Sequence, residues 1–372
     1  MGKRMTRGRS RASEHEPIPT GSDWAESGGQ LIWAVDFTEG GLPYGLSEDE
    51  LRTSSEETDW QAGWVRAKRV MRVALERWAG AGARADVGYV KKIGDGLSRE
   101  IFAAEVDVGG ASKHHVLHVA ALLPHEGAGA GIGVRTKSEF QLLRYLGQIQ
   151  LPFRVPKAFG VVPEAGHLSL VRSFERGIEL DLRAGRQGRV RPWEVVGGIA
   201  AAIHQVTAQQ LGSPQLRFSN RREHAKSTLD RFEGLSGPEA NDARAWIMEH
   251  LPAPEPSVLV HGDLLGQNIL LGLDEGDAVI DWEYAQFGDP AYDLAIVTRA
   301  ARRPFQIDRG LERLLEAYER AGGSEVKPCH VHIHELGLAG HWYQEALKGH
   351  GPHAPEQQLQ FLSGLLRRVT KN

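Results

Sequence analysis

Three polar side chains near the middle of the sequence have the types and spacing that phosphoryl transfer needs. Asp263 and Asn268 lie five residues apart, and Asp281 follows the apolar run Ala278-Val279-Ile280. Phosphoryl transfer needs a carboxylate to receive the acceptor's proton, and an amide oxygen with a second carboxylate to hold magnesium. We therefore predict that Asp263 is the catalytic base and that Asn268 and Asp281 bind magnesium.

Each of these pieces has an ordinary alternative when taken alone. His-Gly-Asp is commonly a turn, because Gly and Asp suit turns for backbone reasons. An Asp after an apolar strand often begins a loop. The combination favours function, because H-x-D-x-x-x-x-N is followed by Asp281-Trp282 and then by the segment Gly288-Asp289-Pro290-Ala291-Tyr292-Asp293-Leu294-Ala295.

The whole pattern resembles the protein-kinase catalytic loop and its metal-binding Asp. Gly262 after His261, and Trp282 after Asp281, make it similar to the aminoglycoside phosphotransferase and choline kinase superfamily. The resemblance covers about three quarters of the chain. It implies that His261 holds the catalytic loop by hydrogen bonds and that Asp293 supports the loop from below, with a plain helix-end acid as the alternative for Asp293.

The resemblance also implies the fold class, whereas the parts before residue 88, about which it says little, are expected from the residues themselves. The fold is expected to be α+β and two-lobed, like a protein kinase, with a small antiparallel-sheet N-lobe, a mainly helical C-lobe and a helical N-terminal extension. The expected parts are a disordered tail (1–28), the helical extension (29–87), the nucleotide-binding N-lobe (88–175) and the C-lobe with the catalytic loop, metal and acceptor site (176–372).

The extension contains an amphipathic helix at about 59–79, because apolar side chains recur there at helical spacing with basic residues between them. Two interpretations remain open for this helix. Its apolar side packs on the body of the protein, or its basic side binds a membrane or an anionic ligand.

Strands are expected in the N-lobe at 89–93, 101–108 and 116–123. Between the first two lie Gly94, Gly96 and Ser98, and a glycine-rich hairpin lets backbone N–H groups approach phosphates. An ordinary turn is the alternative. Strand alternation would direct Ile101 and Val116 onto one face of the nucleotide base. A second glycine-rich stretch at 127–133 lacks the Lys-Ser or Lys-Thr of a P-loop, and we expect a flexible connection to a helix at 136–146.

That helix carries Glu139, which the resemblance pairs with a strand lysine that grips the nucleotide phosphates. His118 stands where Lys or Arg is expected. We therefore expect His118 to meet Glu139 and the phosphates, or to leave this role to a neighbour such as Lys113. A strand histidine without a ligand role is the alternative.

Bulk properties exclude several classes of protein. The net charge of −4 among 372 residues gives no bulk attraction to nucleic acid or membranes. The one cysteine, Cys329, excludes a disulfide within the chain and suits a reducing compartment. His330, His332 and His334 beside it match no familiar zinc motif. We expect a cytoplasmic protein, monomeric or homodimeric, without nucleic-acid or membrane partners.

Together these features predict an enzyme that uses ATP or GTP and magnesium to phosphorylate a hydroxyl group of a small molecule. The acceptor would be an aminoglycoside-type antibiotic or another hydroxylated metabolite. A polycationic aminoglycoside needs an acidic pocket, whereas residues 307–372 mix acidic and basic side chains, and His341, Trp342, Tyr343 and Glu345 suit a smaller, partly aromatic pocket. The alternative, favoured by His118 and the long extension, is a nucleotide-binding, catalytically weak kinase-like regulator.

Overall fold

The computed structural model describes residues 24–27, 30–37, 43–47 and 57–371, apart from 97, 111–113, 126–130, 165–166, 212–215, 273–274 and 351. The chain divides into two compact units, residues 1–55 and 56–372. The tail expected at residues 1–28 lies outside the described residues except for residues 24–27.

The first unit contains an antiparallel sheet of three strands, in the order β1-β2-β3. Ser27 pairs with Gln30, and Phe37 pairs with Pro43. These strands occupy part of the range for which a helical extension is expected, so the expectation of helix is corrected there. The strand residues are rich in aromatic and branched side chains, which favour strands. The strands are β1 (Trp24–Ser27), β2 (Gln30–Phe37) and β3 (Pro43–Ser47).

The amphipathic helix of the extension is α2 (Glu57–Ala79), which begins the second unit. Its apolar residues Val70, Met71 and Leu75 are fully buried against the sheet residues Val90 and Phe102. This confirms the interpretation of a helix packed on the body of the protein. Each such buried side chain contributes about 1.5–3 kcal/mol to folding.

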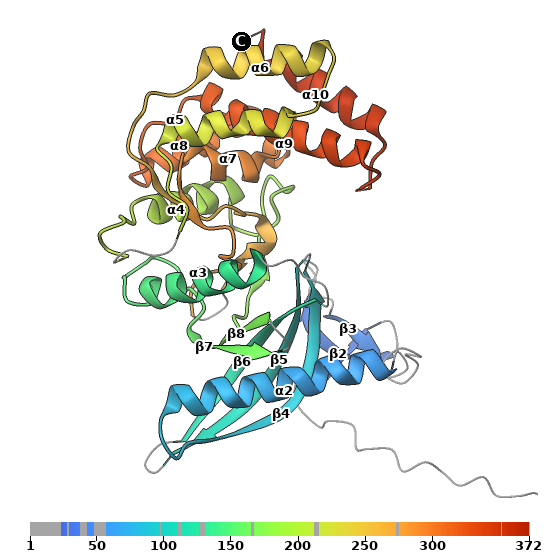
Figure 1. The fold of residues 1–372 in the computed structure, drawn as a ribbon, viewed down its shortest axis with the longest axis vertical. Coiled ribbons are helices and arrows are strands. Elements are labelled where there is room, and N and C mark those ends of the chain that lie inside the picture. Colours follow the sequence, from blue (N-terminus) through green and yellow to red (C-terminus); the bar gives the residue numbers. More distant parts are fainter. Residues whose placement is uncertain are drawn as a thin grey trace, which may run out of the picture. The chain divides into compact units, whose positions relative to one another are not determined.

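A five-stranded antiparallel sheet follows α2, in the order β4-β5-β6-β8-β7 (Figure 1). Alternation along β6 sends Val119 and Ala121 into the core beneath α2, and Ala120 and Leu122 into the core on the opposite face. The three expected strands correspond to β4, β5 and β6, and β7 and β8 complete the sheet. The strands are β4 (Arg84–Asp95), β5 (Arg99–Gly109), β6 (His114–Pro124), β7 (Ala158–Glu164) and β8 (His167–Ser173).

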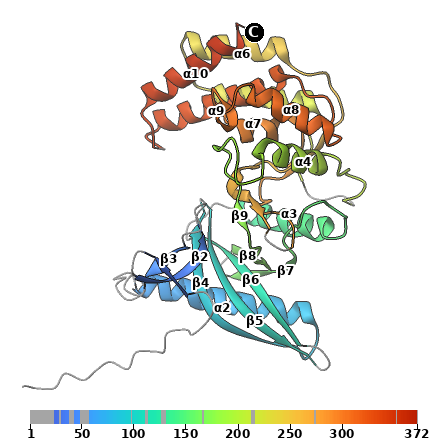
Figure 2. The same ribbon diagram turned by 180° about the vertical axis from the view of Figure 1, so that it is seen from behind.

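Helix α3 (Gly131–Leu146) covers the other face of this sheet from α2, and both views show it between the sheet and the helical part (Figures 1 and 2). Leu142, Leu143 and Leu146 of α3 join the core that also contains Leu170 of β8. The helix begins five residues earlier than predicted, so part of the second glycine-rich stretch is helical. Residues 126–130 of that stretch lie outside the described residues.

The C-terminal part is mainly helical, as expected. None of the described helices is long and apolar enough to cross a membrane. Helix α4 joins α8 through the main core, and α6, α9 and α10 share a separate apolar cluster. The helices are α4 (Pro192–His204), α5 (Arg221–Ser227), α6 (Pro238–His250), α7 (Ala291–Thr298), α8 (Gly310–Arg320), α9 (Pro328–Leu347) and α10 (Pro355–Val369).

Short strands between these helices position the polar segments singled out in the sequence. β10 pairs with β13, and β11 pairs with both β12 and β9, in each case antiparallel. The segment from residue 261 to 268 therefore lies between two anchored strands. The strands are β9 (Ile178–Glu179), β10 (Val258–Val260), β11 (Ile269–Leu271), β12 (Ala278–Val279) and β13 (Gln286–Gly288).

Candidate active site

Asp263 and Asn268 are in direct contact on the loop that joins β10 to β11. The Asn268 side-chain amide donates hydrogen bonds to the Asp263 carboxylate (Nδ2 to Oδ2, 3.0 Å) and to its backbone carbonyl (2.8 Å). Residues 266–268 form a 3-10 turn, which brings the two side chains together. Because Nδ2 makes both contacts, the Oδ1 of Asn268 takes no part in them and is available as a metal ligand.

Asp281 lies beside Asn268 because β11 and β12 form a hairpin. Ile269 is paired with Val279, and the Ile280 N–H donates to the Asn268 carbonyl over 2.9 Å. Asp281 has a φ of 66°, in the left-handed region that non-glycine residues rarely adopt. Such strained residues occur preferentially at functional sites, where the surrounding structure holds them in place.

Asp293, from the first turn of α7, holds the start of the loop. Its carboxylate is fully buried and accepts the backbone N–H groups of His261 (2.8 Å) and Gly262 (2.9 Å). His204 of α4 lies 3.1 Å from the same carboxylate and 2.8 Å from the Tyr318 hydroxyl. Burial alone would raise the pKa of Asp293, but the hydrogen bond from His204 and the electrostatic effects of His204 and His261 outweigh burial and lower the pKa.

The His261 ring is bonded at both nitrogens within the loop. Its Nε2–H donates to the Ile280 carbonyl over 3.0 Å, and its Nδ1 accepts the backbone N–H of Asp263 over 3.2 Å. The ring also packs against Trp282, with centroids 4.6 Å apart. These contacts fix the ring and link the segments that carry Asp263 and Asp281.

The glycine-rich segment forms the hairpin between β4 and β5. The Gly96 N–H donates to the Arg99 carbonyl over 2.8 Å, and Gly94 is paired with Ile101. Ser98 directs its hydroxyl to the carboxylate of Glu283, at 3.3 and 3.4 Å. Since Glu283 is two residues beyond Asp281, the hairpin lies next to the candidate metal ligand.

Glu139 of α3 has a different partner from the one expected. Arg99, the first residue of β5, places its Nη1 2.5 Å from the Glu139 carboxylate, and its Nη2 donates to the Thr136 hydroxyl over 3.2 Å. Both Arg99 and Glu139 are buried. Arg99 is also 3.5 Å from Glu283. The expected pairing of Glu139 with His118 is therefore wrong.

The exposed His118 lies instead at the segment that follows β8, because its Nδ1 is 3.4 Å from Nη2 of Arg176. The His118 carbonyl accepts the N–H of Phe174 there. The strand-histidine alternative thus describes His118 better than a partnership with Glu139 does. The other candidate for this role, Lys113, lies outside the described residues.

Ile101 and Val116 share one face of the sheet but are far apart on it. Ile101 is paired with Leu122, whereas Val116 is paired with Asp107 and is 63% exposed. Leu122 and Val116 are six residues apart on β6, which corresponds to about 20 Å along a strand. A single nucleotide base is too short to contact both side chains, so their expected pairing on one base is wrong.

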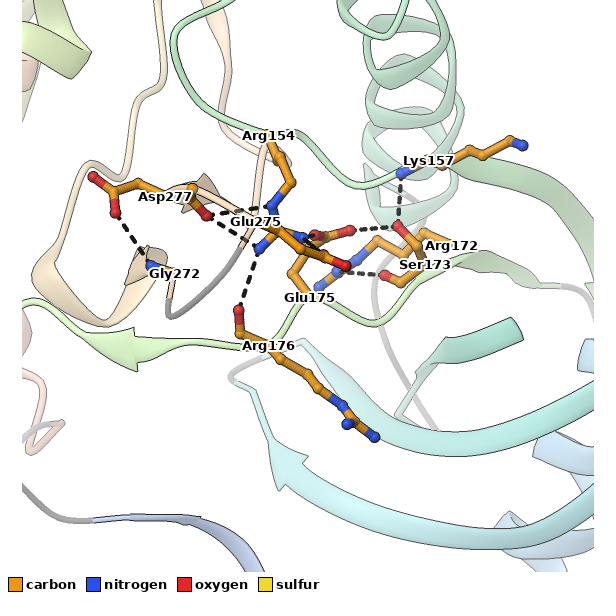
Figure 3. Close-up of polar contacts among 10 residues, drawn as sticks. Arg154, Lys157, Arg172, Ser173, Glu175, Arg176, Gly272, Glu275 and Asp277 are labelled. Carbon is orange, nitrogen blue, oxygen red and sulfur yellow. Dashed lines mark hydrogen bonds and ion pairs between the residues drawn. The ribbon is translucent and has the colours of Figure 1, made fainter. Parts of the chain in front are cut away.

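Arg154, in the loop after α3, connects the segment after β8 with the turn between β11 and β12 (Figure 3). Its Nη1 lies 2.5 Å from Glu175 and 3.0 Å from Glu275, and its Nη2 donates to the Arg176 carbonyl over 3.3 Å. Its backbone pairs with residues 277 and 279. The strand that leads to Asp281 is therefore tied to the connection between the sheet and the C-terminal part.

Burial raises the pKa of Asp263 above its usual value, and the neighbouring Asp281 adds to the rise. His261 and the hydrogen bond from Asn268 act in the opposite direction. A carboxylate whose pKa is raised in this way is a better proton acceptor than a free aspartate, which is what a general base needs.

The donor set at Asn268 and Asp281 fits magnesium. Both offer oxygen ligands, which magnesium prefers, and magnesium usually takes one or two protein carboxylates and completes its shell with phosphates and water. Among the described residues no group of three or more His, Cys, Asp and Glu is placed to hold a metal ion alone. A metal at this site would depend on oxygens from a phosphate ligand.

Two of the residues suggested for an acceptor pocket, Trp342 and Glu345, are engaged with other side chains. Arg299 lies over the Trp342 ring at 5.3 Å, and Glu345 forms ion pairs with Lys348 and His350. Of the histidines near Cys329, His332 is bonded to Glu335 and His334 to Asp289. These contacts account for His332 and His334.

The two-lobed architecture and the loop of Asp263 and Asn268 beside Asp281 define a protein-kinase-like phosphotransferase fold. Residues 134–329, more than half of the chain, match the family model described as the phosphotransferase enzyme family. The protein belongs to this family.

Solved structures of similar fold include macrolide and aminoglycoside phosphotransferases. Macrolide 2'-phosphotransferase type I has a TM-score of 0.54 at 21% identity and covers 85% of this chain and 97% of its own. The macrolide 2'-phosphotransferase MphH from Brachybacterium faecium has a TM-score of 0.52 at 21% identity, covering 78% and 97%. The GDP complex of aminoglycoside 2'-phosphotransferase-IIIa has a TM-score of 0.54 at 15% identity and covers 76% of this chain and 94% of its own. These identities support the shared fold.

One curated relative is similar over a short stretch. Acyl-CoA dehydrogenase family member 10 of Mus musculus is 38% identical over 69 residues, which is 18% of this chain. The matched stretch is 6% of the length of that protein.

Sequence reasoning missed two charged residues at the site, Arg99 and Glu283. Arg99 directly follows the glycine-rich hairpin, while the range of β6, residues 114–124, contains no Lys or Arg. An arginine beside the hairpin, together with a strand β6 that lacks Lys and Arg, was the signal in the sequence for Arg99. Glu283 has no comparable signal, because only the fold brings it to Ser98 and Arg99.

Proposed function

We propose that this protein transfers the γ-phosphoryl group of ATP or GTP to a hydroxyl group of a small molecule. The observation that carries the proposal is the contact of Asp263 with Asn268 on a loop held by Asp293, next to the strained Asp281. This is the arrangement that a base, a metal site and a rigid loop require.

In this proposal Asp263 orients the acceptor hydroxyl and takes its proton. The raised pKa of Asp263 suits that step. Magnesium held by Asn268 and Asp281 supplies neutralising charge for the phosphates. Positioning contributes most of the acceleration, so the contacts of Asp293 and His261 with the loop matter as much as the base.

The glycine-rich hairpin covers the phosphates in this proposal, with Gly94 and Gly96 giving close backbone approach. The contact of Ser98 with Glu283 supports it, because that contact sets the hairpin beside the Asp281 segment.

For the acceptor we propose a hydroxylated metabolite or antibiotic that carries few positive charges. Arg299 covers Trp342 and also opposes the rise in the pKa of Asp263. Glu345 is already paired with Lys348 and His350. A polycation would meet an arginine near Asp263 and find this carboxylate engaged, which is unfavourable.

The test is turnover by the purified protein with magnesium and ATP or GTP against a panel of hydroxylated compounds, measured as release of nucleoside diphosphate. Asp263→Asn is expected to lower kcat by about 10²- to 10⁴-fold, with an unchanged unfolding temperature. Near-normal turnover by Asp263→Asn would refute the assignment. Nucleotide binding without turnover across the whole panel would favour the regulatory alternative instead.

A further inference from the structure

We propose that Arg99 is the residue that binds the phosphate chain of the nucleotide, in place of a basic residue on β6. This inference rests on the proposed function, since it names a further binding residue of the same site. It deepens that function by assigning the phosphate contact to the end of the glycine-rich hairpin, on β5.

Strand β6 offers no cation suited to the task. Its only basic side chains are His114, His115 and His118, all of which are exposed. His118 contacts Arg176, and His114 pairs with Asp107 near the far end of the sheet. The buried Glu139 therefore needs its cation from another element, and Arg99 supplies it.

Arg99 lies where three segments of the candidate site meet. It follows Ser98 at the end of the hairpin, Nη1 and Nη2 contact Glu139 and Thr136 of α3, and Nη2 is 3.5 Å from Glu283. Phosphates that bridge the hairpin to a metal on Asp281 would have to pass this guanidinium. One residue thus couples the hairpin, α3 and the Asp281 segment.

The Arg99 guanidinium keeps its charge and retains bonding capacity. Burial alone would lower its pKa, but Glu139 and Glu283 outweigh burial and raise the pKa. Its Nε is buried and has no hydrogen-bond partner within the described part of the chain. Because guanidinium is a planar fork of five donors, it can hold Glu139 with one nitrogen and offer others to a phosphate, which a lysine does less well.

A second buried arginine favours an anionic ligand at the same place. Arg172 of β8 makes no ion pair with any described residue. Its Nη1 donates to the Ser173 carbonyl over 3.2 Å (Figure 3), and its Nε has no hydrogen-bond partner among the described residues. Burial lowers the pKa of Arg172, against the attraction of Glu139 and Asp281. A buried cation without a close counter-ion is costly, and a phosphate chain would supply that counter-ion.

Equilibrium binding of magnesium ADP, measured by calorimetry, tests the proposal without requiring a known acceptor. Arg99→Ala is expected to weaken binding about 10- to 100-fold, because the variant loses its hydrogen bonds to the charged phosphates. Arg99→Lys is expected to weaken it about tenfold. The exposed Arg186→Ala is the matched control and should bind like the wild type.

The Arg99→Ala variant leaves Glu139 buried without its cation and is expected to lose stability. The double variant Arg99→Ala/Glu139→Gln removes that unpaired charge. We expect it to recover the wild-type unfolding temperature while its affinity for magnesium ADP stays low. A purely structural role for Arg99 predicts the opposite, with affinity recovering together with stability.

Wild-type affinity in the double variant would overturn the inference and leave the proposed function intact. So would a His118→Ala variant that loses as much affinity as Arg99→Ala. A wild-type protein that binds neither magnesium ADP nor magnesium GDP would overturn both the inference and the proposed function. Where an acceptor is found, Arg99→Lys should raise the KM for nucleotide and leave the KM for acceptor within about twofold.

Discussion

The backbone of Gly262 packs directly against the carbonyl of Tyr284: a β-carbon at residue 262 would lie 2.2 Å from that oxygen. Gly262 also has a φ of 83°, which glycine adopts without strain. The loop that carries Asp263 therefore meets the segment after Asp281 at a point where only glycine fits. This contact explains the Gly262 that distinguishes the sequence motif.

Gly262→Ala should consequently move the loop and weaken the site. We expect kcat to fall about 100-fold, because displacements near 1 Å at a reacting group have that effect. Stability should fall by about 1–3 kcal/mol from the strained conformation. Turnover and urea unfolding measure the two effects.

Gly198→Ala is the matched control for this substitution. Gly198 lies within α4, and a β-carbon there meets nothing within 4 Å. Alanine at that helix position should stabilise the protein by about 0.5–1 kcal/mol and leave turnover unchanged. Full activity in Gly262→Ala would contradict the role of the Gly262 contact with Tyr284.

Asp293→Asn should lower kcat with little change in the KM for nucleotide. Its carboxylate accepts two backbone N–H groups and faces His204, whereas an amide must turn an NH2 group toward one of those donors. A loss of about 3 kcal/mol of stability is expected from the broken buried network. If Asp293→Asn lost as much nucleotide affinity as kcat, Asp293 would act on more of the site than the catalytic loop.

The pH dependence of stability follows from the same carboxylate. The folded pKa of Asp293 is lowered, so its contribution is present above the unfolded pKa of about 3.9 and is lost as pH falls toward the folded value. Unfolding in urea between about pH 5 and 2 should show this loss of stability in the wild type. The Asp293→Asn variant should lose less stability over the same pH range.

How much of this site was predictable depends on how far apart in the sequence its partners lie. Asp263 and Asn268 are joined by a short turn, so their contact followed from spacing alone. The partner of Glu139 required knowing which strand neighbours α3, and His118 was the wrong choice because its side chain is exposed beside Arg176. Only the folded sheet brings Arg99 to Glu139.

The same physical reason explains the remaining errors. Strand alternation correctly put Ile101 and Val116 on one face, but the register that separates them is set by pairing with Leu122 and Asp107. The first three strands are a separate case, because they pair with neighbours in the sequence and their aromatic and branched residues, which favour strands, were a signal that sequence reasoning missed. Side-chain periodicity predicts the face of the sheet on which a residue lies, whereas strand pairing determines where along the sheet it lies.

A buried histidine gives a separate pH prediction. Burial, with His334 nearby, lowers the pKa of His224 to about 4, and its Nδ1 accepts the Asp289 backbone N–H over 2.9 Å. The nearby Asp289 opposes this shift. The unfolded ring has a pKa of about 6.5, so the stabilisation is complete above that pH and is lost progressively down to about pH 4.

Lowering the pH from 7 to 5 should therefore cost about 2 kcal/mol of stability through His224. Urea unfolding at the two pH values measures this difference. His224→Asn should reduce the difference, whereas the exposed His353→Asn should keep it. An undiminished pH dependence in His224→Asn would assign the effect to another group.

The Arg154 guanidinium should stabilise the connection between the sheet and the C-terminal part. It bonds Glu175 and Glu275 (Figure 3). The Glu175 side chain is 7% exposed, whereas that of Glu275 is 76% exposed. The buried partner also accepts a bond from the Ser173 hydroxyl at 2.5 Å. Because exposed ion pairs contribute little, the bond to Glu175 carries most of the effect.

We expect Arg154→Met to lose about 2–3 kcal/mol in urea unfolding, since it leaves Glu175 without its cation. Glu275→Gln should change stability by less than about 0.5 kcal/mol. The double variant Arg154→Met/Glu175→Gln should recover part of the loss, because no buried charge is then left unpaired. A fully stable Arg154→Met would show that the backbone bonds of Arg154 to residues 277 and 279 suffice to hold the strand that leads to Asp281.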